Sequence, residues 1–225
     1  MGGLGSDLLE RFQQAASELD GLDRAAYTEA KRDQNEPIFG LGPANASIAF
    51  FGRDPGREEI KHGVPFIGAG GQQIRRVLHQ RARHSALATT EQAIAAGIGF
   101  FWANTVPYKP LGNKAWSMAV KRRFQPLVAT VLLDYWHGHN VITLGREAFF
   151  WFAIGQSAAV AKQLAEHWQQ AERFERVLPI RYQGPKSASR AFVLHPLPHP
   201  SPLNATWFKH FPRLLEQRLN QLEAG

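Results

Sequence analysis

The sequence predicts a three-layer α/β protein, in which a central, mostly parallel sheet of four strands is flanked by helices. Short apolar runs that end at turn residues alternate along the chain with longer segments of helical period, which is the pattern of α/β layering. With 225 residues, 44% of them hydrophobic, and with 15 Phe and 6 Trp, the chain can bury a substantial core. We therefore expect one domain over residues 1–225, with residues 1–45 as a helical extension packed on it.

The expected elements follow in chain order. The first helix is predicted over residues 6–22, where Ser6 is a suitable cap and apolar residues recur on one face. These apolar residues are Leu8, Leu9, Phe12, Ala15, Ala16 and Leu19. The four predicted strands are the short apolar runs at residues 47–51, 99–106, 141–144 and 191–194. Further helices are expected at residues 71–83, at 117–136, from Gly145 onward and at 204–222.

The charge balance favours a polyanionic partner. The chain has 26 Lys and Arg against 19 Asp and Glu, a formal net charge of +7, and a pI near 10.0. A face toward nucleic acid is expected to carry basic residues from this set: Arg75, Arg76, Lys109, Lys114, Lys121, Arg122, Arg123 and Lys209.

Composition also excludes several classes of protein. Cysteine is absent from the sequence, so disulfides, thiolate metal sites and Cys-ligated iron–sulfur clusters are excluded. The first residues lack the basic and apolar regions of a signal peptide, and no apolar run is as long as a membrane span. We expect a cytoplasmic protein without membrane contact, associated with the nucleoid if it is bacterial.

Three predicted strands end in short loops whose side chains can carry chemistry. These loops are Gly52-Arg53-Asp54-Pro55-Gly56, Asn104-Thr105-Val106 and His199-Pro200-Ser201-Pro202-Leu203. They offer an acid, an amide and an imidazole. In an open α/β sheet, ligands bind beyond the carboxyl ends of the strands, so we expect the three loops to converge there.

Each candidate residue has a functional and a structural interpretation. The Asp54 carboxylate can orient a water molecule or stabilise positive charge, although Asp-Pro-Gly is also a common turn sequence. Asn104 offers a donor and an acceptor, which match the edge of uracil, or it bonds its own loop. Phe66, beside Pro65 and before Gly68, is either the floor for a flipped base or a core residue.

The loop around His199 is stiffened by four prolines. These prolines prevent a helical pair with His195, and no acidic residue is adjacent, so we expect no metal site. Ser201 can donate to a phosphate. Leu203 looks exposed, although it can instead pack as a hydrophobic staple on the last helix.

Together these motifs resemble those of the uracil-DNA glycosylase superfamily, over about residues 46–215. Residues 199–203 resemble the DNA-intercalation loop of the mainstream members. Gly52, Asp54 and Pro55 match their water-activating loop, and residues 104–106 are similar to their uracil-binding strand. Residues 65–68 and 141–145 look more like the iron–sulfur branch, whose cluster cysteines are absent from this chain.

The resemblance implies a monomeric enzyme of base excision repair that flips uracil out of DNA and hydrolyses its N-glycosidic bond without a cofactor. Asp54 would orient the attacking water, and His199 would bond uracil O2 as negative charge builds on the leaving base. The other implied contacts are Gly52, Arg53, Phe66 and Asn104 for the substrate base, and Ser201, Pro202, Leu203 and Lys114 for DNA.

Two positions depart from the family pattern. Gly56 stands where mainstream members carry a tyrosine that blocks the methyl group of thymine, which leaves open the range of bases excised. Arg53 adds positive charge beside Asp54, and it either lowers the pKa of that carboxyl or contacts a DNA phosphate.

Two alternatives to uracil excision stay open at this point. The first is a superfamily-like protein that binds DNA without catalysis or removes a different base. The second is an α/β enzyme that binds a mononucleotide at the glycines of residues 68–71.

Overall fold

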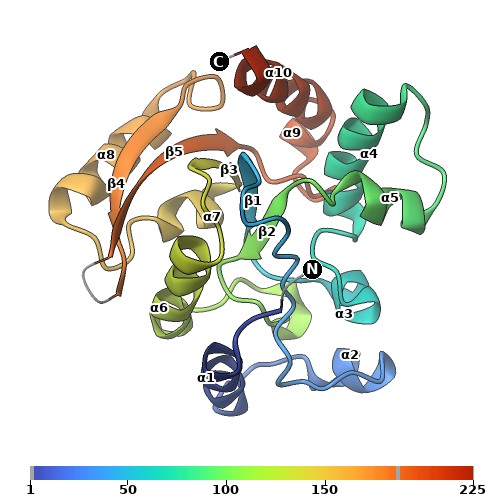
Figure 1. Ribbon diagram of the computed structural model, residues 1–225, viewed down its shortest axis with the longest axis vertical. Helices are drawn as coiled ribbons and strands as arrows, with labels where there is room; N and C mark the ends of the chain where they lie inside the picture. Colours follow the sequence, from blue (N-terminus) through green and yellow to red (C-terminus); the bar gives the residue numbers. More distant parts are fainter. Residues whose placement is uncertain (1–2, 186–187, 225) are drawn as a thin grey trace.

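The computed structural model describes residues 3–185 and 188–224. Its centre is a five-stranded sheet with the strand order β2-β1-β3-β5-β4 (Figure 1). The strands are β1 (Ile48–Gly52), β2 (Phe101–Asn104), β3 (Asn140–Leu144), β4 (Leu178–Gln183) and β5 (Ser189–Leu197). β1 pairs in parallel with β2 and β3, β3 pairs in parallel with β5, and β4 pairs antiparallel with β5.

The predicted α/β fold with a mostly parallel sheet is confirmed, but the predicted number of four strands is wrong. The additional strand is β4, whose residues alternate between exposed and more buried positions. Pro179 and Arg181 interrupt its apolar character, as is tolerated in a strand at the edge of a sheet. Strands β1, β2 and β3 are mainly apolar because helices bury both faces of the sheet there.

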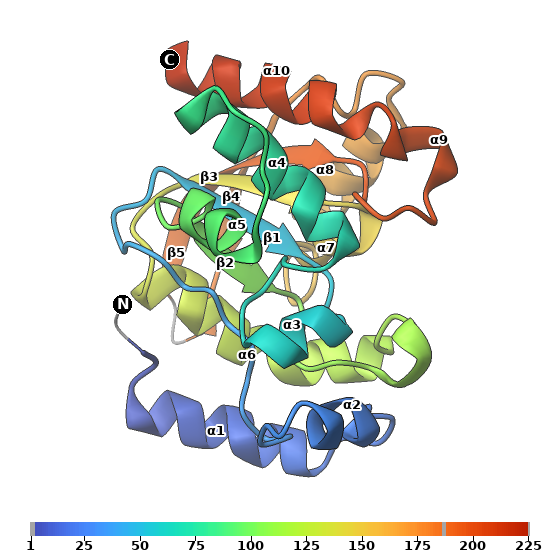
Figure 2. The same ribbon diagram turned by 90° about the vertical axis from the view of Figure 1, so that its right-hand side faces the viewer.

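Helices lie on both faces of the sheet (Figures 1 and 2). They are α1 (Ser6–Ser17), α2 (Arg24–Glu29), α3 (Arg57–His62), α4 (Ala69–Arg83), α5 (Thr90–Ala96), α6 (Met118–Asp134), α7 (Arg146–Trp151), α8 (Ala158–Gln169), α9 (Ala205–Phe208) and α10 (Phe211–Ala224), with a short 3-10 helix η1 (Leu111–Asn113). Among the described residues, no helix combines the length and the apolar character that crossing a bilayer requires.

Several helix boundaries differ from the prediction. The first helix ends at Ser17, not at residue 22, and its N-cap is Gly5 while Ser6 is already helical. The predicted last helix is divided into α9 and α10. Pro212 lies in the first turn of α10, where its missing N–H costs no hydrogen bond, so it favours a new helix start at that point.

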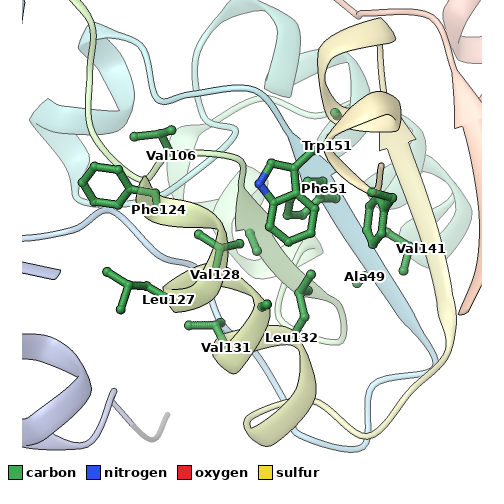
Figure 3. Close-up of a cluster of buried hydrophobic side chains, with 14 of the residues drawn as sticks. Ala49, Phe51, Val106, Phe124, Leu127, Val128, Val131, Leu132, Val141 and Trp151 are labelled. Carbon is green, nitrogen blue, oxygen red and sulfur yellow. The ribbon is translucent and has the colours of Figure 1, made fainter. Parts of the chain in front are cut away.

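Alternate residues of β1, β2 and β3 pack into two separate cores. Phe50 and Trp102 point toward α4 and α10, with ring centroids 4.6 Å apart. Ala49 and Phe51 point to the opposite face, toward α6 and α7 (Figure 3). Full burial of an aromatic side chain such as Phe51 contributes about 1.5–3 kcal/mol. The two cores hold the parallel strands in register, so their carboxyl ends form one edge.

The N-terminal helix α1 lies outside α6, on the side away from the sheet (Figure 2). Phe12 is fully buried, and its ring stacks on that of Phe124 of α6 with centroids 6.2 Å apart. The buried Lys109 also pairs with Asp23, which precedes α2, at 2.9 Å. These contacts attach residues 6–29 to α6 and to the segment after β2.

Candidate active site

A pocket of about 590 Å³ lies beyond the carboxyl ends of β1, β3 and β5. Its volume is in the range of small-molecule sites. The pocket wall comes from the loop after β1, the loop before α4, the end of β3 and the loop after β5. It is lined by Gly52, Arg53, Asp54, Pro55, Gly56, Glu59, Phe66, Gly68, Ala69, Gly70, Gly71, Leu144, His199, Pro200, Ser201, Pro202, Leu203 and Asn204.

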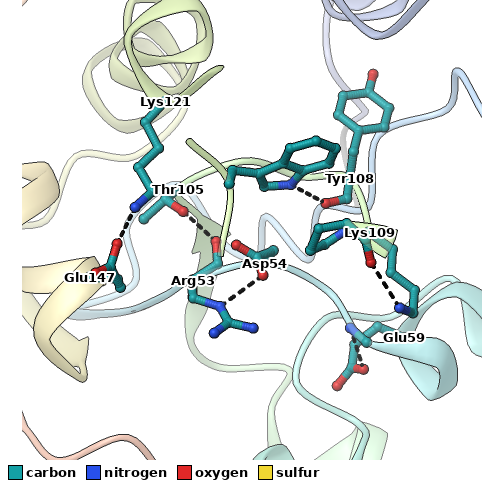
Figure 4. Close-up of polar contacts among 11 residues, drawn as sticks. Arg53, Asp54, Glu59, Thr105, Tyr108, Lys109, Lys121 and Glu147 are labelled. Carbon is teal, nitrogen blue, oxygen red and sulfur yellow. Dashed lines mark hydrogen bonds and ion pairs between the residues drawn. The ribbon is translucent and has the colours of Figure 1, made fainter. Parts of the chain in front are cut away.

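Asp54 is one of the two acids that line this pocket. It follows the end of β1, and its side chain is only 1% exposed. Oδ2 accepts a hydrogen bond from Nε of Arg53 at 2.8 Å (Figure 4), while Oδ1 accepts none from the described residues. Burial raises the pKa of Asp54 to about 6, and the Arg53 guanidinium opposes this rise. Of the two roles left open for Arg53, the structure shows contact with the Asp54 carboxylate. There the Arg53 charge lowers the pKa of Asp54, but burial raises it by more.

The end of β2 fixes the backbone of the Asp54 loop. The Thr105 N–H donates to the carbonyl of Gly52 at 2.8 Å, and the Thr105 hydroxyl donates to the carbonyl of Arg53 (Figure 4). The segment after β2 therefore supports the loop after β1, as the shared strand edge predicts.

Phe66 covers the end of β1. A Cβ at position 52 would lie 2.4 Å from Cε1 of Phe66, so the ring can approach this closely only because residue 52 is glycine. The ring is half-buried, and its centroid lies 5.3 Å from that of Trp102. Phe66 thus contacts the core on one side and lines the pocket on the other.

His199 enters the pocket from the loop after β5. It packs on Gly145, where a Cβ would lie 2.8 Å from Cβ of His199 and where φ is +87°. Burial, with a smaller contribution from the nearby Arg53 charge, lowers the pKa of His199 to about 4. The imidazole is therefore neutral at pH 7, and it can donate one hydrogen bond into the pocket.

The same loop carries an exposed apolar tip. Nδ2 of Asn204 donates to the carbonyl of His199 at 3.1 Å, and the Leu203 N–H donates to Oγ of Ser201 at 3.2 Å. These bonds fix the loop backbone, yet the Leu203 side chain is 95% exposed. A hydrophobic staple on the last helix would bury this side chain, so the staple interpretation of Leu203 is wrong.

Two predicted site residues lie outside the pocket wall. Asn104 is buried at the end of β2, paired in register with Gly52 of β1, and its Oδ1 accepts no hydrogen bond within the described part of the chain. Lys114 is exposed in the segment between η1 and α6. The structure brings together the other predicted residues: Gly52, Arg53, Asp54, Phe66, His199, Ser201, Pro202 and Leu203.

Three of the basic residues expected on a nucleic-acid face are buried, so that expectation is wrong for them. Arg75 is 2% exposed and donates to backbone carbonyls, among them that of Ala93 at 2.7 Å. Lys109 pairs with Asp23. Lys121 pairs with Glu147 (Figure 4). Tertiary partners hold these charges inside the fold. The other residues of the expected set lie on the surface: Arg76, Lys114, Arg122, Arg123 and Lys209.

Glu59 also lines the pocket, although the sequence around it does not predict a site residue. It belongs to α3, a short helix rich in charge, and its carboxylate accepts hydrogen bonds from the backbone N–H groups of Gly56, Ile67 and Gly68. The spacing of Gly56 and Glu59 is that of a helix N-cap and its third residue, which is the available sequence signal. Because Glu59 already occupies the Gly68 N–H, the alternative of a phosphate cradle at residues 68–71 loses one of its donors.

The fold and the pocket together define a class of protein. An acid and a neutral imidazole face one pocket beyond the carboxyl ends of parallel strands, which is the arrangement of an α/β enzyme. Among the described residues, no cluster of three His, Asp or Glu side chains is arranged to hold a metal ion.

Comparison with known families identifies the chain more closely. Residues 39–223 match the model of the uracil DNA glycosylase superfamily, so the chain belongs to this superfamily, as its motifs predicted. A search of curated proteins found no significant match. Membership assigns the chain a DNA glycosylase type of function, with DNA as the substrate.

Proposed function

We propose that the protein removes uracil from DNA by hydrolysing the bond between the base and the deoxyribose. Superfamily membership supports glycosidic hydrolysis, and the choice of uracil is the further step. The observation that carries the proposal is that Asp54 and His199 face one pocket, with the exposed Leu203 on the same loop as His199.

Asp54 supplies the negative charge that this reaction needs. As the bond between C1′ and N1 breaks, its electron pair moves to the base and positive charge develops on the sugar. The ionised Asp54 stabilises this charge, and its Oδ1 accepts a hydrogen bond from the attacking water. The water oxygen then bonds to C1′, and its proton is released. Since the pKa of Asp54 is about 6, the carboxylate is mainly ionised at neutral pH.

His199 acts on the departing base. The neutral imidazole donates a hydrogen bond to O2 of uracil, where negative charge collects as the bond breaks. A donor placed for the charged form of the base stabilises the transition state more than the bound substrate. The base is released after it takes up a proton at N1.

The remaining residues bind the flipped nucleotide. Phe66 offers a half-buried ring on which the base stacks. Asn104 lies behind the pocket wall, so reading the pyrimidine edge with its Oδ1, which has no partner among the described residues, requires the wall to open toward it. Leu203 fills the gap that the flipped nucleotide leaves in the duplex, while Ser201 and Pro202 contact the adjacent backbone. The chemistry proceeds with water and these side chains, so the proposal includes no cofactor.

The test is base release from labelled oligonucleotides that carry uracil, thymine or hypoxanthine, both single-stranded and paired. The wild type is compared with Asp54→Asn and His199→Ala. We expect uracil release by the wild type, a loss of about 100-fold or more in each variant, and melting temperatures close to that of the wild type.

The other outcomes select the alternatives. Release of hypoxanthine or thymine without uracil would identify a glycosylase for a different base. DNA binding without release of any base would overturn the proposal in favour of a binding protein. A glycosylase for a different base has structural support, because Gly56 leaves the pocket without a side chain at that position.

A further inference from the structure

Glu59 joins the two loops that carry Asp54 and Phe66. Its Oε2 accepts the N–H of Gly56 at 2.9 Å, and its Oε1 accepts the N–H groups of Ile67 at 3.0 Å and Gly68 at 2.7 Å. The residue is only 8% exposed, although it lines the pocket. A buried carboxylate with three N–H donors makes strong, charge-assisted hydrogen bonds, so it fixes the positions of both loops.

Arg75 of α4 holds the Phe66 loop from its other side. Its Nε donates to the carbonyl of Phe66 at 2.7 Å, and its Nη2 donates to the carbonyl of Pro65 at 2.8 Å. Phe66 has a φ of +55°, a left-handed conformation that costs a non-glycine residue about 1–2 kcal/mol. Arg75 therefore stabilises a strained backbone, but it bonds only one of the two loops.

Gly56 and Gly68 leave the space that the Glu59 carboxylate occupies. A Cβ at position 56 would lie 2.7 Å from Oε2 of Glu59, and a Cβ at position 68 would lie 3.1 Å from both carboxylate oxygens. The φ of Gly56 is −94°, which any residue adopts. Contact with Glu59, and not backbone conformation, thus explains glycine at position 56.

We propose that Glu59 is a positioning residue for base excision, because its carboxylate fixes the Asp54 loop relative to the Phe66 ring. The inference rests on the proposed function, since it concerns the placement of the base against the attacking group. Small displacements between reacting groups carry large penalties in rate, on the order of 100-fold for about 1 Å.

The first test is Glu59→Gln, which keeps the size of the side chain. The amide oxygen can accept from one loop, but the NH₂ group then faces the N–H donors of the other. We expect the single-turnover rate of uracil release to fall by about 100-fold. Affinity for an oligonucleotide with 2′-fluorinated deoxyuridine, which resists hydrolysis, is expected to stay near that of the wild type. The matched control is Glu58→Gln, an exposed neighbour on the same helix that pairs with His62.

The second variant, Gly56→Ala, reaches the same contact from the opposite side. Its Cβ displaces the carboxylate from the Gly56 N–H, so the rate is expected to fall while binding is retained. Amide hydrogen exchange, resolved by residue, reports the hydrogen bonds directly. We expect faster exchange of the Gly56 N–H in Gly56→Ala and of at least one loop's N–H groups in Glu59→Gln.

Distinct results overturn the two proposals. An active wild type with undiminished rates in both variants would overturn the role of Glu59 alone. If the rate, the binding affinity and the melting temperature all fell together in the variants, this role would also be overturned, because such a result indicates a merely structural role. A wild type that releases no base would overturn the proposed function, and with it any role of Glu59 in excision. Hydrogen exchange would then decide whether the Glu59 contacts themselves exist.

Discussion

Arg53 donates its Nε–H to Oδ2 of Asp54 at 2.8 Å, so a cation contacts the acid that follows it in the chain. Two effects on the carboxyl oppose each other here. Burial favours its neutral form, and the guanidinium favours its charged form. Burial is the larger effect, which leaves the pKa of Asp54 raised to about 6. The proposed catalytic charge of Asp54 therefore depends on Arg53.

This relationship predicts the pH dependence of base release. Asp54 acts as a carboxylate, so the single-turnover rate should rise with pH up to about 6 and then level off. Below that pKa we expect a loss of about tenfold for each pH unit. His199 has a pKa of about 4 and is neutral over most of this range, so it adds little to the slope near pH 6.

In Arg53→Gln, the pH range over which the rate rises (the acidic limb of the pH–rate profile) should move to higher pH. Burial then raises the pKa of Asp54 without the opposing cation. The measurement is the rate of uracil release between pH 5 and 9 in both proteins. A limb at the same pH in wild type and variant would show that Arg53 does not set the charge of Asp54.

A second prediction concerns Gly145, which lies against His199. Its φ of +87° and ψ of 173° fall in a region open almost only to glycine, and a Cβ would lie 2.8 Å from Cβ of His199. We expect Gly145→Ala to destabilise the protein by about 1–3 kcal/mol and to slow base release by displacing the imidazole. Thermal unfolding and single-turnover kinetics measure the two effects.

The control for that variant is Gly99→Ala, since a Cβ at position 99 has no neighbour within 4 Å. Its stability is expected to stay within about 0.5 kcal/mol of the wild type. If Gly145→Ala proved as stable and active as this control, the close approach of residues 145 and 199 would be unimportant.

The third prediction separates DNA opening from chemistry. Leu203 is 95% exposed, so Leu203→Ala should leave the free energy of unfolding within about 0.5 kcal/mol of the wild type. In duplex DNA, unstacking a base costs a few kcal/mol, and the inserted leucine side chain would offset part of this free energy. Without it, base release from duplex DNA should slow by about tenfold or more. Release from single strands should change little. Leu111→Ala is the control, because Leu111 is an exposed leucine of η1 and does not line the pocket. Equal slowing on both substrates would contradict a wedge role.

The sequence predicts the parts of the fold in which consecutive residues are all buried. The strands ending at Gly52 and Leu144 are buried on both faces, so their apolar runs are visible without knowledge of the fold. The edge strand β4 mixes Pro179 and Arg181 with buried Ile180 and Tyr182, so it offers no continuous apolar run, although its antiparallel partner β5 follows closely in sequence. Such a strand is not defined by its own composition.

The candidate site shows the same division. Asp54 and His199 can be proposed from sequence because each follows a predicted strand, and parallel strands bring their carboxyl ends together. Glu59 lies beside Arg57 and Glu58 in a sequence typical of an exposed helix. Its burial arises from the loops at Gly56 and Ile67, which tertiary structure brings to it. The same reason explains why Arg75 was expected at the surface and is buried.

The last prediction distinguishes two lysines of neighbouring sequence. Lys109 is 2% exposed and pairs with Asp23 at 2.9 Å, whereas Lys114 is exposed. Removing one partner of a buried pair leaves the other charge uncompensated, so Lys109→Met should cost about 3–5 kcal/mol of stability. If Lys114 contacts a DNA phosphate, Lys114→Ala should leave stability unchanged and reduce the slope of log K against log salt by about one. Fluorescence anisotropy between 50 and 300 mM salt measures that slope, and thermal unfolding measures stability. A reduced slope in folded Lys109→Met, with an unchanged slope in Lys114→Ala, would reverse the two assignments.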